Sequence, residues 1–230
     1  MNRRWRETFL MWTESDEYKS RVAEAISIIK QAFGKYQKPY CSFSGGKDSL
    51  VMTHIVTSLK PDVDVITLDY SRTFVPLRYL IEIKEIAKKL SWNHQVIRSK
   101  ILESSPNDGL PVMLQVLNYE VTPYLLKKGF DVVFVGLRKE ESKWRELRIR
   151  NNKRLTKLPE VYPIAEFSWM DIWAYIISQE LPYLSIYDKY GNIMGWENVR
   201  FSTLFDRELD AFGNSNIDGF FSYRYRFPKK

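Results

Sequence analysis

The stretch Ser-Gly-Gly-Lys-Asp-Ser at positions 44–49 limits the possible folds of this chain more than any other part of the sequence. A β-prone run at 36–43 precedes it, and a helical run follows at about 48–59. Two adjacent glycines allow a sharp turn in which main-chain N–H groups face a bound anion. The helix that begins there directs its free N–H groups and the positive end of its dipole to the same point. Together with the lysine and serine side chains, this turn predicts a phosphate-binding loop.

This loop differs from the Walker loop, which has four residues between its first glycine and its Gly-Lys pair. Here the two glycines are adjacent. The hexapeptide after a strand resembles the pyrophosphate loop of the ATP pyrophosphatases, which cleave ATP between the α and β phosphates. A plain strand-to-helix turn would be the better interpretation of a Gly-Gly pair alone, but the whole hexapeptide favours phosphate binding.

Charge and cysteine content narrow the class of protein. The chain has 35 Lys and Arg against 28 Asp and Glu, a net charge of +7, which suits an anionic ligand but also an ordinary basic surface. Cys41 is the only cysteine, which excludes an internal disulfide, a multi-cysteine zinc site and a cluster held by several cysteines of this chain. We therefore expect neither an iron–sulfur cluster nor zinc. Without a recognisable signal peptide or membrane-length apolar run, we expect a cytoplasmic protein that does not enter a membrane.

Strands and helices are expected to alternate along the chain. After the phosphate loop, strands are predicted at 63–68, 94–97 and 131–135, and helices at 76–90 and 112–128. This order predicts an α/β fold, an open and mostly parallel twisted sheet with helices on both faces. Ligands of such sheets bind beyond the carboxyl ends of the strands. The phosphate loop and Asp69, which ends a strand, would share that edge.

We divide the chain into three regions: an N-terminal arm and helix at 1–35, a nucleotide-binding α/β domain at 36–185, and a basic C-terminal extension at 186–230. Thr13 or Ser15 is expected to cap a helix that ends near Gly34, and Ser168 to cap a helix at 169–180. Whether residues 1–14 pack on the body or reach a partner remains open, as does whether the extension covers the active site or binds a partner.

Two segments are rich in basic residues. Segment 138–157 carries nine Lys and Arg against three Glu, and forms either a solvated face or an arm that closes over phosphates. Its position after a strand favours the arm. The tail at 223–230 alternates aromatic and basic side chains, a pattern that binds nucleic acid through phosphate contacts and stacking, or that folds over the active site.

Three segments agree with one family in order and spacing: 44–49, the Val-Gly-Leu-Arg-Lys-Glu-Glu-Ser run at 135–142, and 162–176 followed by Leu-Pro-Tyr at 181–183. Together they resemble the phosphoadenylyl-sulfate (PAPS) reductase family of PP-loop ATP pyrophosphatases, over roughly residues 38–205. That family includes the reductases, the small subunit of heterodimeric ATP sulfurylase and related adenylyltransferases.

The resemblance implies the adenine nucleotide α-hydrolase fold, with ATP and Mg²⁺ at the strand ends. It implies catalytic roles for Lys47, Asp48 and Arg138, with Asp48 or alternatively Asp69 as a Mg²⁺ ligand, and with Arg138 and Arg145 at the α-phosphate. The nucleotide-binding residues that it implies are Ser42, Phe43, Ser44, Gly45, Gly46, Lys47, Asp48, Ser49, Leu68, Asp69, Tyr70, Gly136, Leu137 and Arg138. Tyr70-Ser71 departs from the Thr-Gly that usually follows the aspartate in this family.

The family's reductases use a cysteine near the C-terminus, and this chain has no cysteine after Cys41. Cys41 itself is expected to be buried in a strand and inert. The chain is therefore closer in character to the sulfurylase small subunit and the adenylyltransferases, and we expect adenylyl transfer from ATP with release of pyrophosphate. The acceptor is open among sulfate, a flavin and a nucleic acid. Two alternatives are a sulfonucleotide reductase that uses an external thiol, and a non-catalytic module that senses a nucleotide or associates with nucleic acid or a protein partner.

Overall fold

A computed structural model describes residues 1–69, 77–101, 115–152 and 154–201. Tyr70 and the tail at 223–230, both singled out by the sequence, lie outside the described residues. No helix in the described ranges is both long and apolar enough to cross a membrane.

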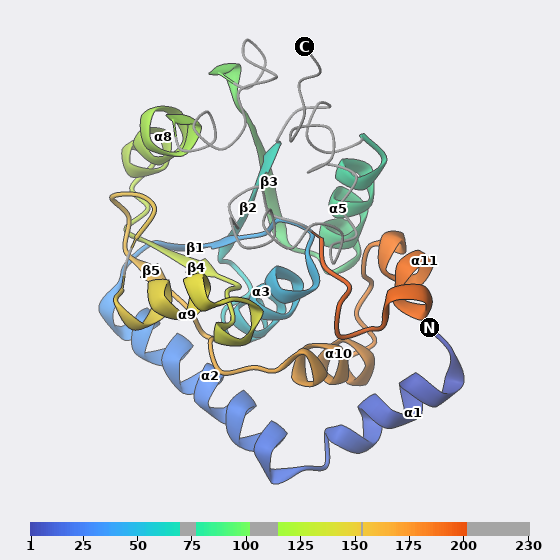
Figure 1. The fold of residues 1–230 in the computed structure, drawn as a ribbon. Coiled ribbons are helices and arrows are strands. Elements are labelled where there is room, and N and C mark those ends of the chain that lie inside the picture. The colour runs from blue at the N-terminus through green and yellow to red at the C-terminus, as the bar shows by residue number, and fades with distance from the viewer. Residues whose placement is uncertain (70–76, 102–114, 153, 202–230) are drawn as a thin grey trace.

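The described chain is built on one parallel five-stranded sheet in the order β3-β2-β1-β4-β5 (Figure 1). The strands are β1 Pro39–Ser42, β2 Asp64–Asp69, β3 Asn93–Arg98, β4 Val132–Val135 and β5 Glu160–Val161. The four longer ones match the predicted strands, and the short β5 adds a fifth at the edge beside β4. Since the chain runs outward from β1 to β3 and then returns to β4, the order reverses at β1, which leads into the phosphate loop.

Helices connect the strands, and further helices precede β1 and follow β5. They are α1 Arg3–Trp12, α2 Asp16–Lys35, α3 Lys47–Leu59, α5 Leu77–Lys89, α8 Thr122–Lys127, α9 Lys143–Arg150, α10 Trp169–Ser178 and α11 Ser185–Met194, with a π-helical turn η1 Val116–Val121 and a 3₁₀ turn η2 Lys139–Glu141. Pro123 lies within the helix predicted at 112–128 and is tolerated there, because it stands in the first turn of α8, where its missing N–H is not needed.

Side chains of the sheet alternate between two cores, as the two-residue period of a strand requires. Cys41, Val65 and Phe134 pack with α2, α3 and α10 on one face. Tyr40 and Val133 pack with η1 and α8 on the other, where Leu125 and Phe130 complete the cluster. The predicted α/β sheet with helices on both faces is therefore confirmed (Figure 1).

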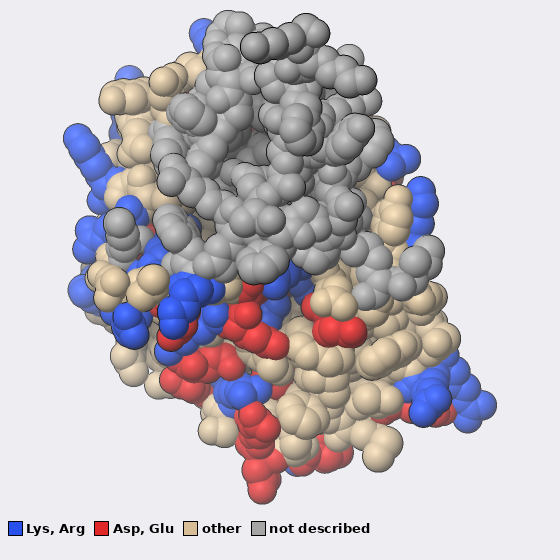
Figure 2. Space-filling model, viewed as in Figure 1, with Lys and Arg blue, Asp and Glu red and all other residues tan. Residues whose placement is uncertain are grey.

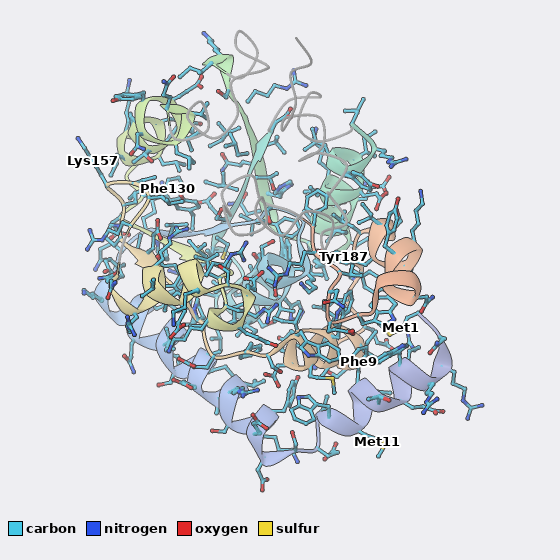
Figure 3. The ribbon with its side chains drawn as sticks, in the orientation of Figure 1. Met1, Phe9, Met11, Phe130, Lys157 and Tyr187 are labelled. Carbon is cyan, nitrogen blue, oxygen red and sulfur yellow. The ribbon has the colours of Figure 1, made fainter. Side chains whose placement is uncertain are left out.

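The N-terminal residues pack on the body. Phe9 of α1 is fully buried against Trp169 and Trp173 of α10, whereas Met11 is 76% exposed and points away (Figure 3). Ser15 caps α2 by accepting from the Tyr18 N–H, as predicted. The open choice for residues 1–14 is thus settled in favour of packing.

Segment 185–199 joins the same core from the C-terminal side. Trp196 is fully buried and stacks edge-on against Trp173 at a centroid distance of 4.7 Å. The Trp173 indole N–H donates to the Trp196 carbonyl at 2.9 Å, and Tyr187 of α11 packs on the same ring. The larger core therefore draws on all three predicted regions, and the division at 35 and 185 stays a prediction.

Candidate active site

The phosphate loop links the end of β1 to the first turn of α3. Gly45 adopts φ +83°, the left-handed region that glycine tolerates and that other residues rarely adopt. A Cβ at this position would also lie 2.4 Å from Cγ1 of Ile83 on α5. Gly45 is thus required both by the turn and by the helix packed against it.

Some main-chain N–H groups of the loop have an acceptor in the described part of the chain, and others do not. Ser44 N–H donates to the Ser49 hydroxyl at 3.2 Å, and Lys47 N–H donates to the buried Tyr187 hydroxyl at 2.9 Å. For the N–H groups of Gly45, Asp48 and Ser49, the described part of the chain provides no acceptor. Main-chain donors at a helix N-terminus are favourable partners for phosphate oxygens.

Gly136, at the end of β4, lies against the first turn of α3. A Cβ on Gly136 would lie 2.8 Å from both the nitrogen and the Cα of Ser49, and 2.9 Å from the carbonyl carbon of Asp48. These are backbone atoms, so they could move aside only by displacing the helix. The absence of a side chain at 136 therefore sets the distance between the phosphate loop and the segment after β4.

Asp48 lies between two buried cations. Its Oδ1 accepts from Arg138 Nε at 2.5 Å, and its Oδ2 accepts from Lys47 Nζ at 3.0 Å. Lys47 and Arg138 are 1% and 2% exposed. Arg138 also donates to Glu140 at 2.9 Å. This network fixes α3 to the segment after β4.

The charges in this network shift one another's pKa. Burial alone would raise the pKa of Asp48, but Arg138 and Lys47 outweigh it and hold that pKa well below the usual range. Burial lowers the pKa of Lys47, and Asp48 opposes this. For Arg138, Asp48 and Glu141 outweigh burial and raise the pKa. Asp48 is therefore ionised throughout the neutral range.

A cavity opens beside the loop, over the face of the sheet that carries Tyr40. Its residues come from the loop, from β1, η1 and β4, and from the two segments that follow β4 and α11. They are Tyr40, Ser42, Ser44, Gly46, Asp48, Ser49, Leu117, Val133, Val135, Gly136, Leu137, Glu141, Arg145, Arg148, Leu155, Thr156, Glu160, Arg200 and Phe201.

Strand register divides this cavity into two ends. Ser42 pairs with Val135 in the row nearest the loop, and Tyr40 pairs with Val133, which pairs with Glu160, in the row before it. Residues two apart on a strand are separated by about 7 Å. The loop end is polar and rich in donors. The other end is mainly apolar, and there the buried Arg148 and Glu160 are paired.

Three arginines of the basic segment 138–157 are buried and paired with carboxylates. Arg138, Arg145 and Arg148 are each 7% exposed or less, so a solvated face is wrong for these three. Arg145 is paired with Glu141, and Arg148 with Glu160 at 2.6 Å. Blue and red side chains are interspersed on the face drawn in Figure 2, with no continuous basic track across its described part.

Seven of the predicted nucleotide-binding residues line the cavity: Ser42, Ser44, Gly46, Asp48, Ser49, Gly136 and Leu137. Six others that the structure describes do not line it: Phe43, Gly45, Lys47, Leu68, Asp69 and Arg138. Phe43 packs edge-on against Trp92 in the core, and Asp69 is paired with Arg98 at 3.4 Å. Tyr40, Glu141, Arg148 and Glu160 also line the cavity but were not predicted as site residues. Tyr40 lies in the predicted first strand, Glu141 and Arg148 in the basic run, and Glu160 just after it, and none of these patterns indicates a ligand-binding role.

Two further predictions concern cysteine and metal. Cys41 is fully buried, as expected, and burial raises the pKa of its thiol, so the reactive thiolate is disfavoured. Within the described ranges, no group of three or more His, Cys, Asp or Glu could hold a metal ion. Both Asp48 oxygens already accept from cations, which does not fit the role of a Mg²⁺ ligand.

Comparisons with known proteins identify the family and the fold. An adenosine 5′-phosphosulfate reductase of Bacillus cereus is 26% identical over 200 residues, 80% of this chain and 81% of the relative. The PAPS reductase of Candida auris, solved as a phosphate complex, has a TM-score of 0.55 at 15% identity and covers 76% of this chain and 92% of its own.

The U34-tRNA thiolase NcsA of Methanococcus maripaludis has a TM-score of 0.53 at 11% identity, over 91% of this chain and 78% of its own. That protein is described with its [4Fe-4S] cluster, so the fold itself does not support the predicted absence of a cluster, which rests only on the single cysteine. The family model described as the phosphoadenosine phosphosulfate reductase domain matches residues 38–207. This chain belongs to the phosphoadenosine phosphosulfate reductase family.

Proposed function

We propose that this protein binds ATP and transfers its adenylyl group. An acceptor oxyanion attacks the α-phosphorus, the bond from that phosphorus to the α,β-bridging oxygen breaks, and pyrophosphate leaves with the electron pair. The observation that carries the proposal is the cavity with two unlike ends. Unoccupied N–H donors of the phosphate loop flank one end, and the apolar surface of Tyr40 and Val133 forms the other. Such a cavity suits a ligand with phosphates at one end and a flat base at the other.

Catalysis in this scheme consists of positioning and charge neutralisation, because transfer at phosphorus requires little covalent chemistry of the protein. The N–H groups of Asp48 and Ser49, which line the cavity, hold the departing pyrophosphate. Arg200 lies at the same cavity, and its Nη1 is buried with no hydrogen-bond partner in the described part of the chain. Its guanidinium is the side chain that we assign to the charge developing on the phosphates.

For Lys47 and Arg138 we propose a role other than the catalytic one that the sequence predicts. Both side chains are buried and bonded to Asp48, and neither lines the cavity. We therefore assign them a positioning role. They hold the first turn of α3 against the segment after β4, so that the free N–H groups of the loop keep one orientation.

The proposal is tested by incubating the protein with ATP and Mg²⁺, alone and with sulfate, FMN or DNA, and separating the products. Pyrophosphate with AMP or an adenylyl adduct is the expected result, and the acceptor that stimulates turnover names the substrate class. Formation of ADP and inorganic phosphate would contradict the proposal, because it requires attack at the other end of the triphosphate.

A sulfonucleotide reductase is the second candidate, favoured by the name of the Bacillus cereus relative. Its chemistry requires a thiol, and the only thiol of this chain is fully buried in β1. The reduction would therefore depend on an external thiol. Incubation with adenylyl sulfate or PAPS plus thioredoxin tests it, and we expect no sulfite from either substrate.

A further inference from the structure

Arg148 is a buried arginine with one donor that has no partner among the described residues. The residue is 6% exposed and lines the cavity at the end away from the phosphate loop. Its Nη2 donates to Glu160 Oε2 at 2.6 Å. Its Nε is buried, and among the described residues no atom accepts from it. A buried donor without an acceptor costs free energy in the unliganded protein and is a ready partner for a ligand.

Glu160 fixes the position of this guanidinium and neutralises it. Besides Arg148, the carboxylate accepts from the Tyr162 hydroxyl and from the Leu155 N–H at 3.0 Å. With three donors from the chain, Glu160 holds one orientation. Because the arginine charge is matched by this carboxylate, the pair favours a neutral acceptor atom over a second anion.

The surroundings of the pair suit a flat ring. Tyr40 and Val133 lie in the strand row that contains Glu160, and Leu117 and Leu155 line the same end of the cavity. Phosphates held at the first turn of α3 would lie about two residues further along the strands, roughly 7 Å away. This spacing brings the base of a bound nucleotide, and not its phosphates, to Arg148.

We infer that Arg148 Nε donates a hydrogen bond to a ring-nitrogen acceptor of the nucleobase and so helps to select the nucleotide. The inference rests on the proposed nucleotide function and adds a specificity residue to it. Removal of one hydrogen bond from a charged donor corresponds to a loss of affinity of about tenfold or more.

The test combines altered ligands with altered protein. Binding of ATP and of its 1-deaza, 3-deaza and 7-deaza analogues, each lacking one ring nitrogen, is measured by calorimetry on the full chain. Tripolyphosphate serves as a ligand without a base. Arg148→Lys keeps a cation beside Glu160 but lacks the Nε donor. Arg150→Lys, on the exposed part of the same helix, is the matched control.

One analogue is expected to bind the wild type about tenfold or more weakly than ATP, while Arg148→Lys binds that analogue and ATP equally. Arg150→Lys should discriminate as the wild type does, and tripolyphosphate should bind all three proteins alike. If Arg148→Lys unfolds, the double variant Arg148→Gln, Glu160→Gln, which removes both charges together, replaces it.

Equal binding of all analogues by the wild type would overturn the inference, and so would unchanged discrimination in Arg148→Lys. In both cases ATP still binds, so the proposed function survives. Failure of the wild type to bind ATP at all overturns the proposed function and this inference together.

Discussion

Arg138 Nε donates to Asp48 Oδ1 at 2.5 Å, and this contact ties the segment after β4 to the phosphate loop across 90 residues of sequence. Lys47 holds the other oxygen of the same carboxylate. Three buried charges thus fix the relative position of the two segments that form the loop end of the cavity.

Replacement of Asp48 by asparagine should reduce turnover by about 100-fold or more, since the loop loses the charge that orients it. Asp48→Ala leaves the buried Lys47 without its carboxylate and Arg138 with Glu140 alone, and should lower the free energy of unfolding by about 3–5 kcal/mol. Denaturant unfolding and a turnover assay measure the two effects. Asp62→Ala, at an exposed turn, is the control and should change neither.

Acid should weaken the fold through the same carboxylate. A carboxyl with a lowered folded pKa stabilises fully above its unfolded pKa, and the stabilisation is lost as pH falls. For Asp48 the loss should begin below about pH 4, the unfolded pKa of an aspartate. A pH series of unfolding midpoints for wild type and Asp48→Asn checks this: the two curves should converge as the solution becomes more acidic. Parallel curves down to pH 2 would contradict it.

His94 on β3 should produce a second acid-dependent change at higher pH. Burial, with a smaller contribution from Lys84, lowers the pKa of His94 to about 4 from an ordinary 6.5, and its Nε2 lies 2.8 Å from Thr67 Oγ1. The unfolded chain therefore binds more protons between these values, and stability should fall as pH drops from about 6.5 to 4. Thermal melts of His94→Gln should show a shallower decline across this window. An identical decline would exclude His94 as its source.

Gly136 should tolerate no side chain. Gly136→Ala places a Cβ against the backbone of Ser49 and should lower the free energy of unfolding by about 1–3 kcal/mol and weaken ATP binding. Gly34→Ala, inside α2 with nothing within 4 Å of its Cβ, should instead stabilise by about 0.5–1 kcal/mol. Equal effects of the two substitutions in denaturant unfolding would show that the close approach at 136 does not matter.

The thiol should be dispensable. Cys41→Ala removes a fully buried sulfur from β1 and should leave the ATP reaction within about threefold of wild type, because the proposed chemistry uses no thiol. Turnover normalised to the folded fraction measures this. Loss of all activity in a well-folded Cys41→Ala would favour thiol chemistry instead.

Patterns of neighbouring residues in the sequence were enough to predict helix starts and the parallel sheet. Ser15 and Ser168 cap helices as their side chains suggested, and strands alternating with helices gave the parallel sheet. These features depend on neighbours in the chain, so they are readable from it.

Contacts between distant segments could not be predicted in the same way. The basic run after β4 contains no sign that Arg148 would be buried, since its partner Glu160 becomes a neighbour only when α9 packs beside β5. Nor does the Gly- and Asn-rich segment after 187 reveal that Tyr187 bonds the N–H of Lys47, 140 residues away.

The proposed function requires that ATP is cleaved between its α and β phosphates. ATP labelled at the γ-phosphate, incubated with the protein, Mg²⁺ and the stimulating acceptor, tests this directly. The label is expected in pyrophosphate, with about 100-fold less in Asp48→Asn. Label in inorganic phosphate, in a preparation free of pyrophosphatase, would contradict adenylyl transfer.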